Sequence, residues 1–455
     1  MLRRTFATGL GLLAVTRAAR ADDATLLRFA ENAVTANDAR RRTAIEGLLA
    51  SGRRDVVPAL IDLMLFYTDD SDLIAAGLRR LTGQNIATDW HSWMLWQEGE
   101  PQPRPFSGYD TFKARLLYEV DPAFVDFLHP SLPRRIRTEE IVWGGVSKDG
   151  IPALVSPKFV PPEEAPWLWD GEQVFGVEIE GDARAYPHRV MDWHEMANDT
   201  VGGVPVALAY CTLCGSGVLF ESEVAGRAAP FEFGSSGLLY RSNKLMYDRE
   251  TLSLWNHYTG QPVVGPLARE TIELKTRPLA VLRWADWKRR YPKTRVLSLD
   301  TGHRRDYTPG RPYGDYFASS GLMFPARTDD ATLRPKDIVL AVRDGGRHRA
   351  WPMRLFRGGR VLNDAIGTRP VVVVGDGWSD TLRVWERADL TFDSRLDGPA
   401  STPEALYDAA GTRWRVTEEA LIAPDGRRLA RLPAHNAYWF AFAGFTGRNG
   451  SVFTE

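Results

Sequence analysis

One stretch of this chain recurs farther along it, which restricts the fold to architectures that contain two similar units. Residues 174–221 align with residues 339–386 at a constant offset of 165 and without gaps. Thirteen of the 48 aligned positions are identical, and in the first copy they are Val174, Val177, Gly181, Arg184, Ala185, Pro187, Arg189, Asn198, Asp199, Gly202, Pro205, Val206 and Glu221. A repeat of this length predicts two copies of one unit, packed as a pseudo-symmetric pair.

The repeated region has the sequence pattern of β structure. From about residue 136 onward, short runs of β-forming residues alternate with Gly, Pro, Asn and Asp. A weaker similarity extends the repeat, in which Tyr247-Asp248 and Trp255 correspond to Tyr407-Asp408 and Trp414. We therefore predict a first β-rich unit over residues 131–325 and a second, degenerate unit over residues 326–455.

Residues 22–130 have a different pattern, that of short amphipathic helices. Ile45, Leu48 and Leu49 recur at helical spacing, and Pro58 falls where a helix tolerates proline, in its first turn. The helix pairs resemble HEAT-like repeats, but a solenoid generally needs more repeats to be stable, so we expect a helical cap on the β units. The predicted fold class is α+β, with a mostly β main region after a HEAT-like helical region.

The first 21 residues resemble an export signal. A charged start with Arg3-Arg4 precedes a short apolar run, and Ala19-Arg20-Ala21 offers a small-x-small cleavage pattern. The arginine pair is typical of twin-arginine signals, which carry folded proteins. We therefore predict a signal peptide over residues 1–21 and a periplasmic or extracellular protein. No later run of 18 apolar residues occurs, so we expect no stable membrane span.

The charge balance argues against one class of partner. The chain has 57 Lys and Arg residues against 58 Asp and Glu residues, and no basic stripe stands out. A nucleic-acid binder needs clustered basic residues to displace counterions, so we expect no nucleic-acid partner. The sequence leaves open whether the partner is a small molecule or a protein.

The two copies differ at three residues that can carry chemistry. His194, Cys211 and Cys214 occur only in the first copy, where the second has Gly359, Asp376 and Ser379. Shared polar residues such as Asn198-Asp199, repeated as Asn363-Asp364, suit instead a turn that feeds the next strand. We expect shared positions to build the fold and the unshared trio to build a site.

The trio has the composition of a transition-metal site. Two thiolates in a Cys-x-x-Cys-Gly turn and one imidazole suit copper or zinc better than magnesium or calcium. Met246, Asp248 or His257 could supply a fourth ligand. The leading hypothesis is an exported Cys2His metal-binding protein, with copper preferred to zinc. If the protein is an enzyme, redox chemistry at an open copper position is the first expectation.

Two other functions stay open at this point. Cys211 and Cys214 are the only cysteines of the chain, and in an oxidising compartment they could form an exchangeable disulfide. Alternatively, the protein is a non-catalytic periplasmic binding or scaffold protein, in which aromatic residues and the helical cap hold a partner. Neither Gly-x-Ser-x-Gly nor a phosphate-cradling Gly-x-x-x-x-Gly-Lys occurs, which excludes those hydrolase and nucleotide-binding types.

Several ordered motifs carry a family resemblance. They include Ile141-Val-Trp-Gly-Gly-Val, Trp193-His-Glu-Met-x-Asn-Asp, Tyr210-Cys-Thr-Leu-Cys-Gly-Ser-Gly, Gly237-Leu-Leu-Tyr-x-Ser-Asn and Met246-Tyr-Asp-Arg-Glu-Thr. Over residues 136–455 the chain resembles the domain of unknown function 3179 family of exported bacterial and archaeal proteins, for which no activity is established.

The resemblance also indicates which candidate site residues are typical of the family. It places the His194, Cys211 and Cys214 trio in the family's most characteristic segments, together with Ser242, Asn243, Asp248 and Trp255. The family pattern more often has Gln at the position of His257. This favours Met246, Asp248 or water as the fourth ligand.

Overall fold

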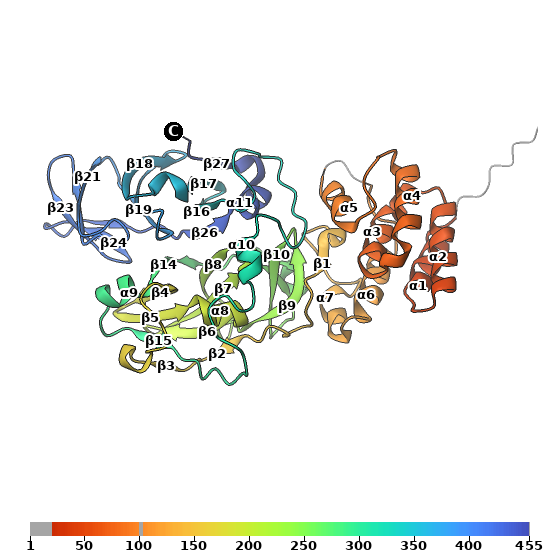
Figure 1. Ribbon diagram of the computed structural model, residues 1–455, viewed down its shortest axis with the longest axis horizontal. Helices are drawn as coiled ribbons and strands as arrows, with labels where there is room; N and C mark the ends of the chain where they lie inside the picture. Colours follow the sequence, from red (N-terminus) through yellow and green to blue (C-terminus); the bar gives the residue numbers. More distant parts are fainter. Residues whose placement is uncertain (1–20, 100–102, 455) are drawn as a thin grey trace, which may run out of the picture.

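The computed structural model describes residues 21–99 and 103–454, and it arranges them as three regions. Figure 1 shows the helical region at one end of the long axis and the two β units side by side at the other. Apart from Ala21, the predicted signal peptide lies outside the described residues. The helices are concentrated before residue 130 and the sheets after it, which confirms the predicted α+β class with a mostly β main region.

The N-terminal region consists of short helices with well-defined ends. They are α1 (Asp23–Ala33), α2 (Asp38–Ala50), α3 (Val57–Phe66), α4 (Ser71–Thr82), α5 (Trp90–Gln97), α6 (Tyr109–Tyr118) and α7 (Val125–Leu128). Asp22 caps α1 by accepting a hydrogen bond of 2.8 Å from the backbone N–H of Thr25, and Asp89 caps α5 in the same way. Gly83 ends α4 in the left-handed conformation.

The helices pack on one another and on the first β unit. A buried ion pair of 2.5 Å joins Lys113 of α6 to Asp62 of α3, and the Tyr109 hydroxyl donates to the same carboxylate. The apolar core of the helices continues into Cys214 and Tyr438, far along the chain. This region is therefore packed as a cap on the β structure. Among the described residues no helix is both long and apolar enough to cross a membrane.

The first β unit contains three five-stranded sheets. In sheet order they are β1 (Ile141–Trp143), β9 (Phe233–Tyr240), β10 (Asn243–Asp248), β11 (Leu254–Asn256) and β12 (Gln261–Val264); then β13 (Thr276–Arg277), β8 (Ser216–Glu221), β7 (Val204–Cys211), β6 (Met196–Val201) and β2 (Leu154–Val155); then β14 (Ala280–Arg283), β4 (Gln173–Ile179), β5 (Asp182–Pro187), β15 (Arg295–Leu297) and β3 (Phe159–Val160). Three helices accompany them: α8 (His188–His194), α9 (Trp284–Arg290) and α10 (Gly314–Ala318).

The second β unit also contains three sheets. In sheet order they are β26 (His435–Tyr438), β16 (Ile338–Asp344), β17 (Arg347–Pro352) and β27 (Gly450–Val452); then β18 (Arg360–Ile366), β19 (Arg369–Asp376) and β20 (Thr381–Glu386); then β21 (Phe392–Asp397), β22 (Ala405–Asp408), β23 (Arg413–Val416), β24 (Ala420–Ile422) and β25 (Arg428–Ala430). The helix α11 (Trp439–Thr446) follows β26.

The strand boundaries reproduce the sequence repeat. Adding 165 to both ends of β4, β5, β7 and β8 gives the ends of β16, β17, β19 and β20. The antiparallel pairing is also shared, because β6 pairs with β7 and β7 with β8, as β18 pairs with β19 and β19 with β20. The two units are therefore copies in structure as well as in sequence.

Shared polar residues hold each copy together. The Asn198 side chain joins β6 to the backbone of Phe233 through two hydrogen bonds of 2.8 and 2.9 Å. Asn363 does the same for Phe392, at 3.0 and 2.7 Å. These asparagines lie within strands rather than in the turn that their sequence context suggests. Their role is structural, as their presence in both copies predicts.

The weaker similarity beyond the aligned stretch is also seen in the structure. The Trp255 indole donates to Asp248 at 2.8 Å, and in the second unit the Trp414 indole donates to Asp408 at 3.0 Å. Because both copies keep this pair, Asp248 and Trp255 serve the fold of their unit.

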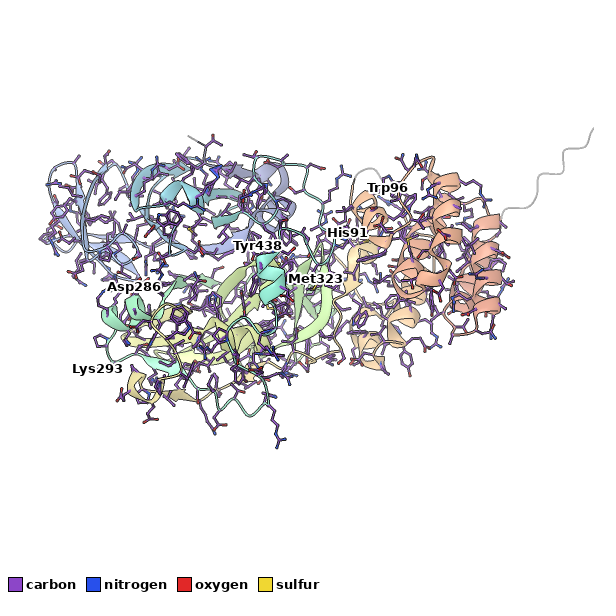
Figure 2. The ribbon with its side chains drawn as sticks, in the orientation of Figure 1. His91, Trp96, Asp286, Lys293, Met323 and Tyr438 are labelled. Carbon is purple, nitrogen blue, oxygen red and sulfur yellow. The ribbon has the colours of Figure 1, made fainter. Side chains whose placement is uncertain are left out.

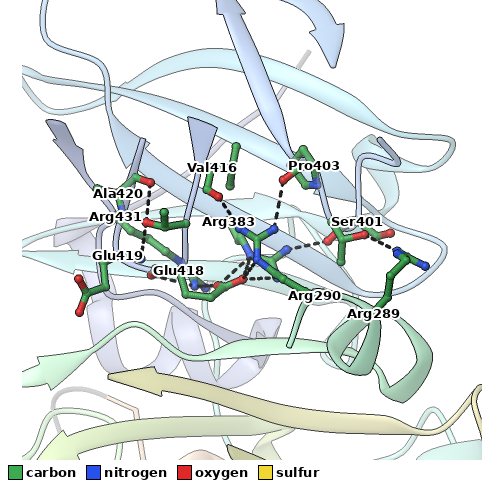
Figure 3. A network of polar contacts seen from close by, with 12 residues as sticks. Arg289, Arg290, Arg383, Ser401, Pro403, Val416, Glu418, Glu419, Ala420 and Arg431 are labelled. Carbon is green, nitrogen blue, oxygen red and sulfur yellow. Dashed lines mark hydrogen bonds and ion pairs between the residues drawn. The ribbon is translucent and has the colours of Figure 1, made fainter. Parts of the chain in front are cut away.

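A buried charged cluster joins the two units, as Figure 3 shows. The Glu418 carboxylate accepts hydrogen bonds from Arg383 at 2.9 and 3.0 Å and also from Arg431. Arg290, on α9 of the first unit, lies 3.5 Å from Glu418 and donates to the backbone oxygen of Val416 at 2.7 Å. Burial alone would raise the pKa of Glu418, but the three arginines lower it. This cluster is one of the contacts between the two units.

Candidate functional site

The two cysteines occupy one tight turn between β7 and β8. Cys211 ends β7, a 3-10 turn spans Thr212–Cys214, and Gly215 adopts a φ of 57° before β8 begins. A Cβ atom on residue 215 would lie 3.2 Å from the Tyr438 ring, so glycine suits both the backbone conformation and the close packing of this ring. Both thiols are free, and Cys211 and Cys214 are 2% and 0% exposed.

The surroundings of Cys214 favour its protonated form. Its sulfur lies 3.2 Å from the side-chain oxygen of Asn243 and 3.5 Å from the backbone oxygen of Ser242, and both atoms accept hydrogen bonds. Burial raises the pKa of Cys214, and the neighbouring Cys211 thiol raises it further. Ser242 and Asn243, which the family resemblance singled out, therefore do contact the cysteine turn.

The structure does not bring His194 to the cysteines as a metal ligand. Its Nδ1 lies 2.8 Å from the backbone oxygen of Pro152, and its Nε2 lies 2.7 Å from the Tyr307 hydroxyl. A carbonyl oxygen only accepts, so Nδ1 carries the proton and Nε2 accepts from Tyr307. The Thr301 hydroxyl, 2.6 Å from that of Tyr307, then donates to it.

His194 is accordingly a neutral, buried histidine that ties together distant loops. Burial lowers its pKa to about 4, although the contact with Pro152 opposes this. Across the described residues, no group of three or more His, Cys, Asp or Glu side chains is arranged to hold a metal ion. The geometry therefore gives no support to a copper or zinc centre built on Cys211, Cys214 and His194.

The candidates for a fourth ligand have separate surroundings. Met246 packs with Trp255 in an apolar core. Asp248 accepts hydrogen bonds from Trp255 and from both the backbone and the hydroxyl of Thr251. His257 Nε2 donates to the backbone oxygen of Ser216 at 3.2 Å, and burial is the largest factor that lowers its pKa to about 3. His257 thus contacts the strand that follows the cysteine turn, and Met246 shares its apolar core with Val218 and Phe220 of that strand.

A polar cluster that the sequence did not predict anchors this turn. The Glu195 carboxylate accepts hydrogen bonds from the Thr212 hydroxyl at 2.8 Å and the Tyr313 hydroxyl at 3.1 Å, and it pairs with buried Lys244 at 3.2 Å. Tyr316, on α10, adds a further contact, because its hydroxyl donates to the backbone oxygen of Leu213 at 2.6 Å. The adjacent motifs contain Glu195, but no spacing rule connects it with residues so distant in sequence.

A cavity of about 440 Å³ opens beside the turn, between the two β units. Gly215 and Tyr210 line it from the cysteine hairpin, and Phe317 lines it from the segment around α10. The second unit contributes Asn436 and Tyr438. Figure 2 shows Tyr438 at the boundary of the two units, beside α10. A cavity of this size at a domain boundary is the usual form of a small-molecule site.

Two polar side chains of α8 also line the cavity. His188 and Asp192 are four residues apart, so they lie on the same helix face. Asp192 is 5% exposed, and within the described part of the chain neither its Oδ1 atom nor the Nε2 atom of His188 has a hydrogen-bond partner. Buried polar atoms are normally paired, so two unpaired ones on residues that line a cavity are unusual and point to a bound partner.

The electrostatic state of these two residues follows from burial. Burial raises the pKa of Asp192 to about 7, repulsion from Glu195 adds to this, and the Tyr210 hydroxyl opposes it. Burial also lowers the pKa of His188 to about 3, so its imidazole is neutral at pH 7. Strongly shifted groups in a cavity are typical of functional sites.

The fold and the cavity together define a class of protein: a duplicated β scaffold with a helical cap and a cavity between the copies. The chain belongs to the family described as protein of unknown function (DUF3179), whose family model matches residues 148–449. This confirms the resemblance seen in the sequence, and the matched range contains the cysteine turn, His194 and Asp192. No curated protein and no solved structure matches the chain.

Proposed function

We propose that the protein binds a small organic molecule in the cavity between its two β units. The observation that carries the proposal is the pair of unpartnered polar atoms, Asp192 Oδ1 and His188 Nε2, on one face of α8 in this cavity. The ring of Phe175 lies 4.1 Å from that of His188 and 5.0 Å from that of Tyr210, measured between centroids. Aromatic walls with a few polar groups are what small-molecule sites contain.

The test is calorimetric titration of the full chain with three probes that share one body. Tyramine, tyrosol and 4-hydroxyphenylacetate each have a hydroxyphenyl ring and a two-carbon arm, and they end in an ammonium, a hydroxyl and a carboxylate group. We expect at least one of them to bind. Val281→Trp, which fills the cavity from β14, should abolish that binding without changing the secondary structure.

A second variant protects the test against misfolding. Ile338→Trp fills the same cavity from the second unit, so either variant suffices if the other fails to fold. Binding that survives in both folded variants would refute the cavity as the site. No binding of any probe at millimolar concentration would refute the proposal itself.

A thiol–disulfide function is the second candidate. The observation that favours it is that both cysteines of the chain are free and share one turn beside the cavity. Oxidation would form the Cys211–Cys214 bond and pass two electrons and two protons to an external disulfide such as oxidised glutathione. A mass decrease of about two units, reversed by dithiothreitol, would support it. The burial of both sulfurs favours the binding function over this one.

A further inference from the structure

More acidic than basic side chains line the cavity. Asp192, Asp380 and Glu172 are carboxyl groups that line it, and Arg189, which also lines it, is bound to Glu172 at 2.6 Å. His188 contributes no charge at neutral pH because burial depresses its pKa. Asp380 lies near Arg283 and Arg357, which partly neutralise it. Asp192 is therefore the wall's uncompensated acid.

Within the described parts of the chain, no basic group lowers the pKa of Asp192. The charged group that most affects it is Glu195, which repels its ionised form, and Glu195 is itself paired with Lys244. The Tyr210 hydroxyl is the one group that favours its ionised form. A positively charged ligand group would remove this imbalance, since an opposite charge at hydrogen-bond distance stabilises a buried carboxylate.

The aromatic walls suit the same kind of ligand. Phe175, Tyr210, Phe317 and Tyr438 all line the cavity. The faces of aromatic rings attract cations, most strongly where water is excluded. An anionic ligand would meet Asp192 and these ring faces with the wrong sign of charge.

We propose that the ligand is a small organic cation, an amine on an apolar or aromatic body, whose ammonium group donates to Asp192. This inference rests on the proposed binding function and specifies its ligand class. His188 Nε2 lies one helical turn away on the same face and provides a second polar contact for the body of the ligand.

Binding of an ammonium group should be coupled to the release of a proton. Because the pKa of Asp192 is about 7 without a ligand, a fraction of the chains carry a proton there at neutral pH. An ammonium group stabilises the ionised form, so binding releases that proton. Affinity for an amine should therefore rise as the pH increases from 6 to 8, while the amine itself stays protonated.

The experiment compares tyramine, tyrosol and 4-hydroxyphenylacetate on wild type, Asp192→Asn and the matched control Asp170→Asn. Asp170 undergoes the same change of charge at a side chain that is 72% exposed. We expect tyramine to bind wild type about tenfold or more tighter than tyrosol, the gain of one charge-assisted contact. Asp192→Asn should remove that preference, whereas Asp170→Asn should preserve it.

Proton release provides a second readout. Tyramine titrations at pH 7 in phosphate and in Tris should give different apparent enthalpies for wild type and equal ones for Asp192→Asn. A variant that keeps the tyramine preference would overturn the inference. If tyrosol or 4-hydroxyphenylacetate binds as tightly as tyramine, and Val281→Trp abolishes this binding, the ligand class is wrong and the cavity function stands. If no probe binds, both proposals fail.

Discussion

The Nε2 atom of His194 lies 2.7 Å from the hydroxyl of Tyr307, which comes 113 residues later in the chain. His194 is fully buried, so the loss of this donor would leave Nε2 without a partner. We predict that Tyr307→Phe lowers the free energy of unfolding by about 1–3 kcal/mol. Urea denaturation at pH 7.5 measures it. Tyr118→Phe, at a residue that is 43% exposed, is the control and should change little.

The buried state of His194 also predicts a dependence on pH. Folding lowers its pKa from 6.5 to about 4, so the unfolded chain takes up the proton first as the pH falls. Its contribution to stability is therefore complete above pH 6.5 and is lost between pH 6.5 and 4, by about 1.4 kcal/mol per pH unit. Unfolding of wild type and His194→Gln across this range isolates the effect. A difference in stability that does not shrink toward pH 4 would contradict it.

The duplicated asparagines provide a matched pair of substitutions. Asn198→Ala and Asn363→Ala each remove two hydrogen bonds to a neighbouring strand, and Asn198→Ala also removes a weaker one of 3.3 Å to the backbone oxygen of Leu154. Each should lower the free energy of unfolding by about 1–3 kcal/mol, with the larger loss at the more buried Asn198. Because the sites lie in different units, the double variant should show the sum. A loss confined to one copy would show that the repeat is not energetically equivalent.

The repeat explains how much of the fold the sequence could predict. Identical spacing in two copies predicted the paired β units, and four strands of the first copy begin and end 165 residues before their counterparts. Helical periodicity predicted the N-terminal cap. The three sheets in each unit were not predicted, because the order of strands in a sheet depends on long-range pairing that local patterns do not encode.

The site was less predictable for the same reason. Residues absent from the second copy did include the cysteine turn, which lies beside the cavity. They also included His194, whose partners Pro152 and Tyr307 cannot be inferred from spacing. Asp192 went unnoticed because its chemistry arises from burial beside a cavity that the second unit also lines, and neither shows in the residue type.

The cysteine turn is covered by other side chains, so we expect its thiols to react slowly with a labelling reagent. Tyr316 and Tyr438 lie over the turn, and Lys336 sits 3.8 Å from the centre of the Tyr316 ring. We predict that N-ethylmaleimide labels neither Cys211 nor Cys214 readily in the folded protein and labels both after unfolding. Tyr316→Phe removes one hydrogen bond of the cover and should speed native labelling about tenfold.

The control for this labelling is a tyrosine substitution away from the turn, and Tyr118→Phe serves again. Equal labelling rates for Tyr316→Phe and Tyr118→Phe would show that α10 does not restrict access. Rapid labelling of wild type would contradict the burial of the thiols and would strengthen the thiol–disulfide candidate.

Glu418 and Glu419 are neighbours in sequence with opposite surroundings. Glu418 is fully enclosed by Arg383, Arg431 and Arg290, whereas the Glu419 side chain is 40% exposed and lies 3.7 Å from Arg428. Glu418→Gln would leave three buried guanidinium groups without their counter-charge. We predict a loss of about 3–5 kcal/mol in the free energy of unfolding. Glu419→Gln should cost less than about 1 kcal/mol, as surface pairs do.

Because Arg290 belongs to the first unit, Glu418→Gln should also weaken the contact between the units. Limited proteolysis would detect this as new cleavage between residues 319 and 337. Equal stability of the two variants would show that this cluster does not hold the units together.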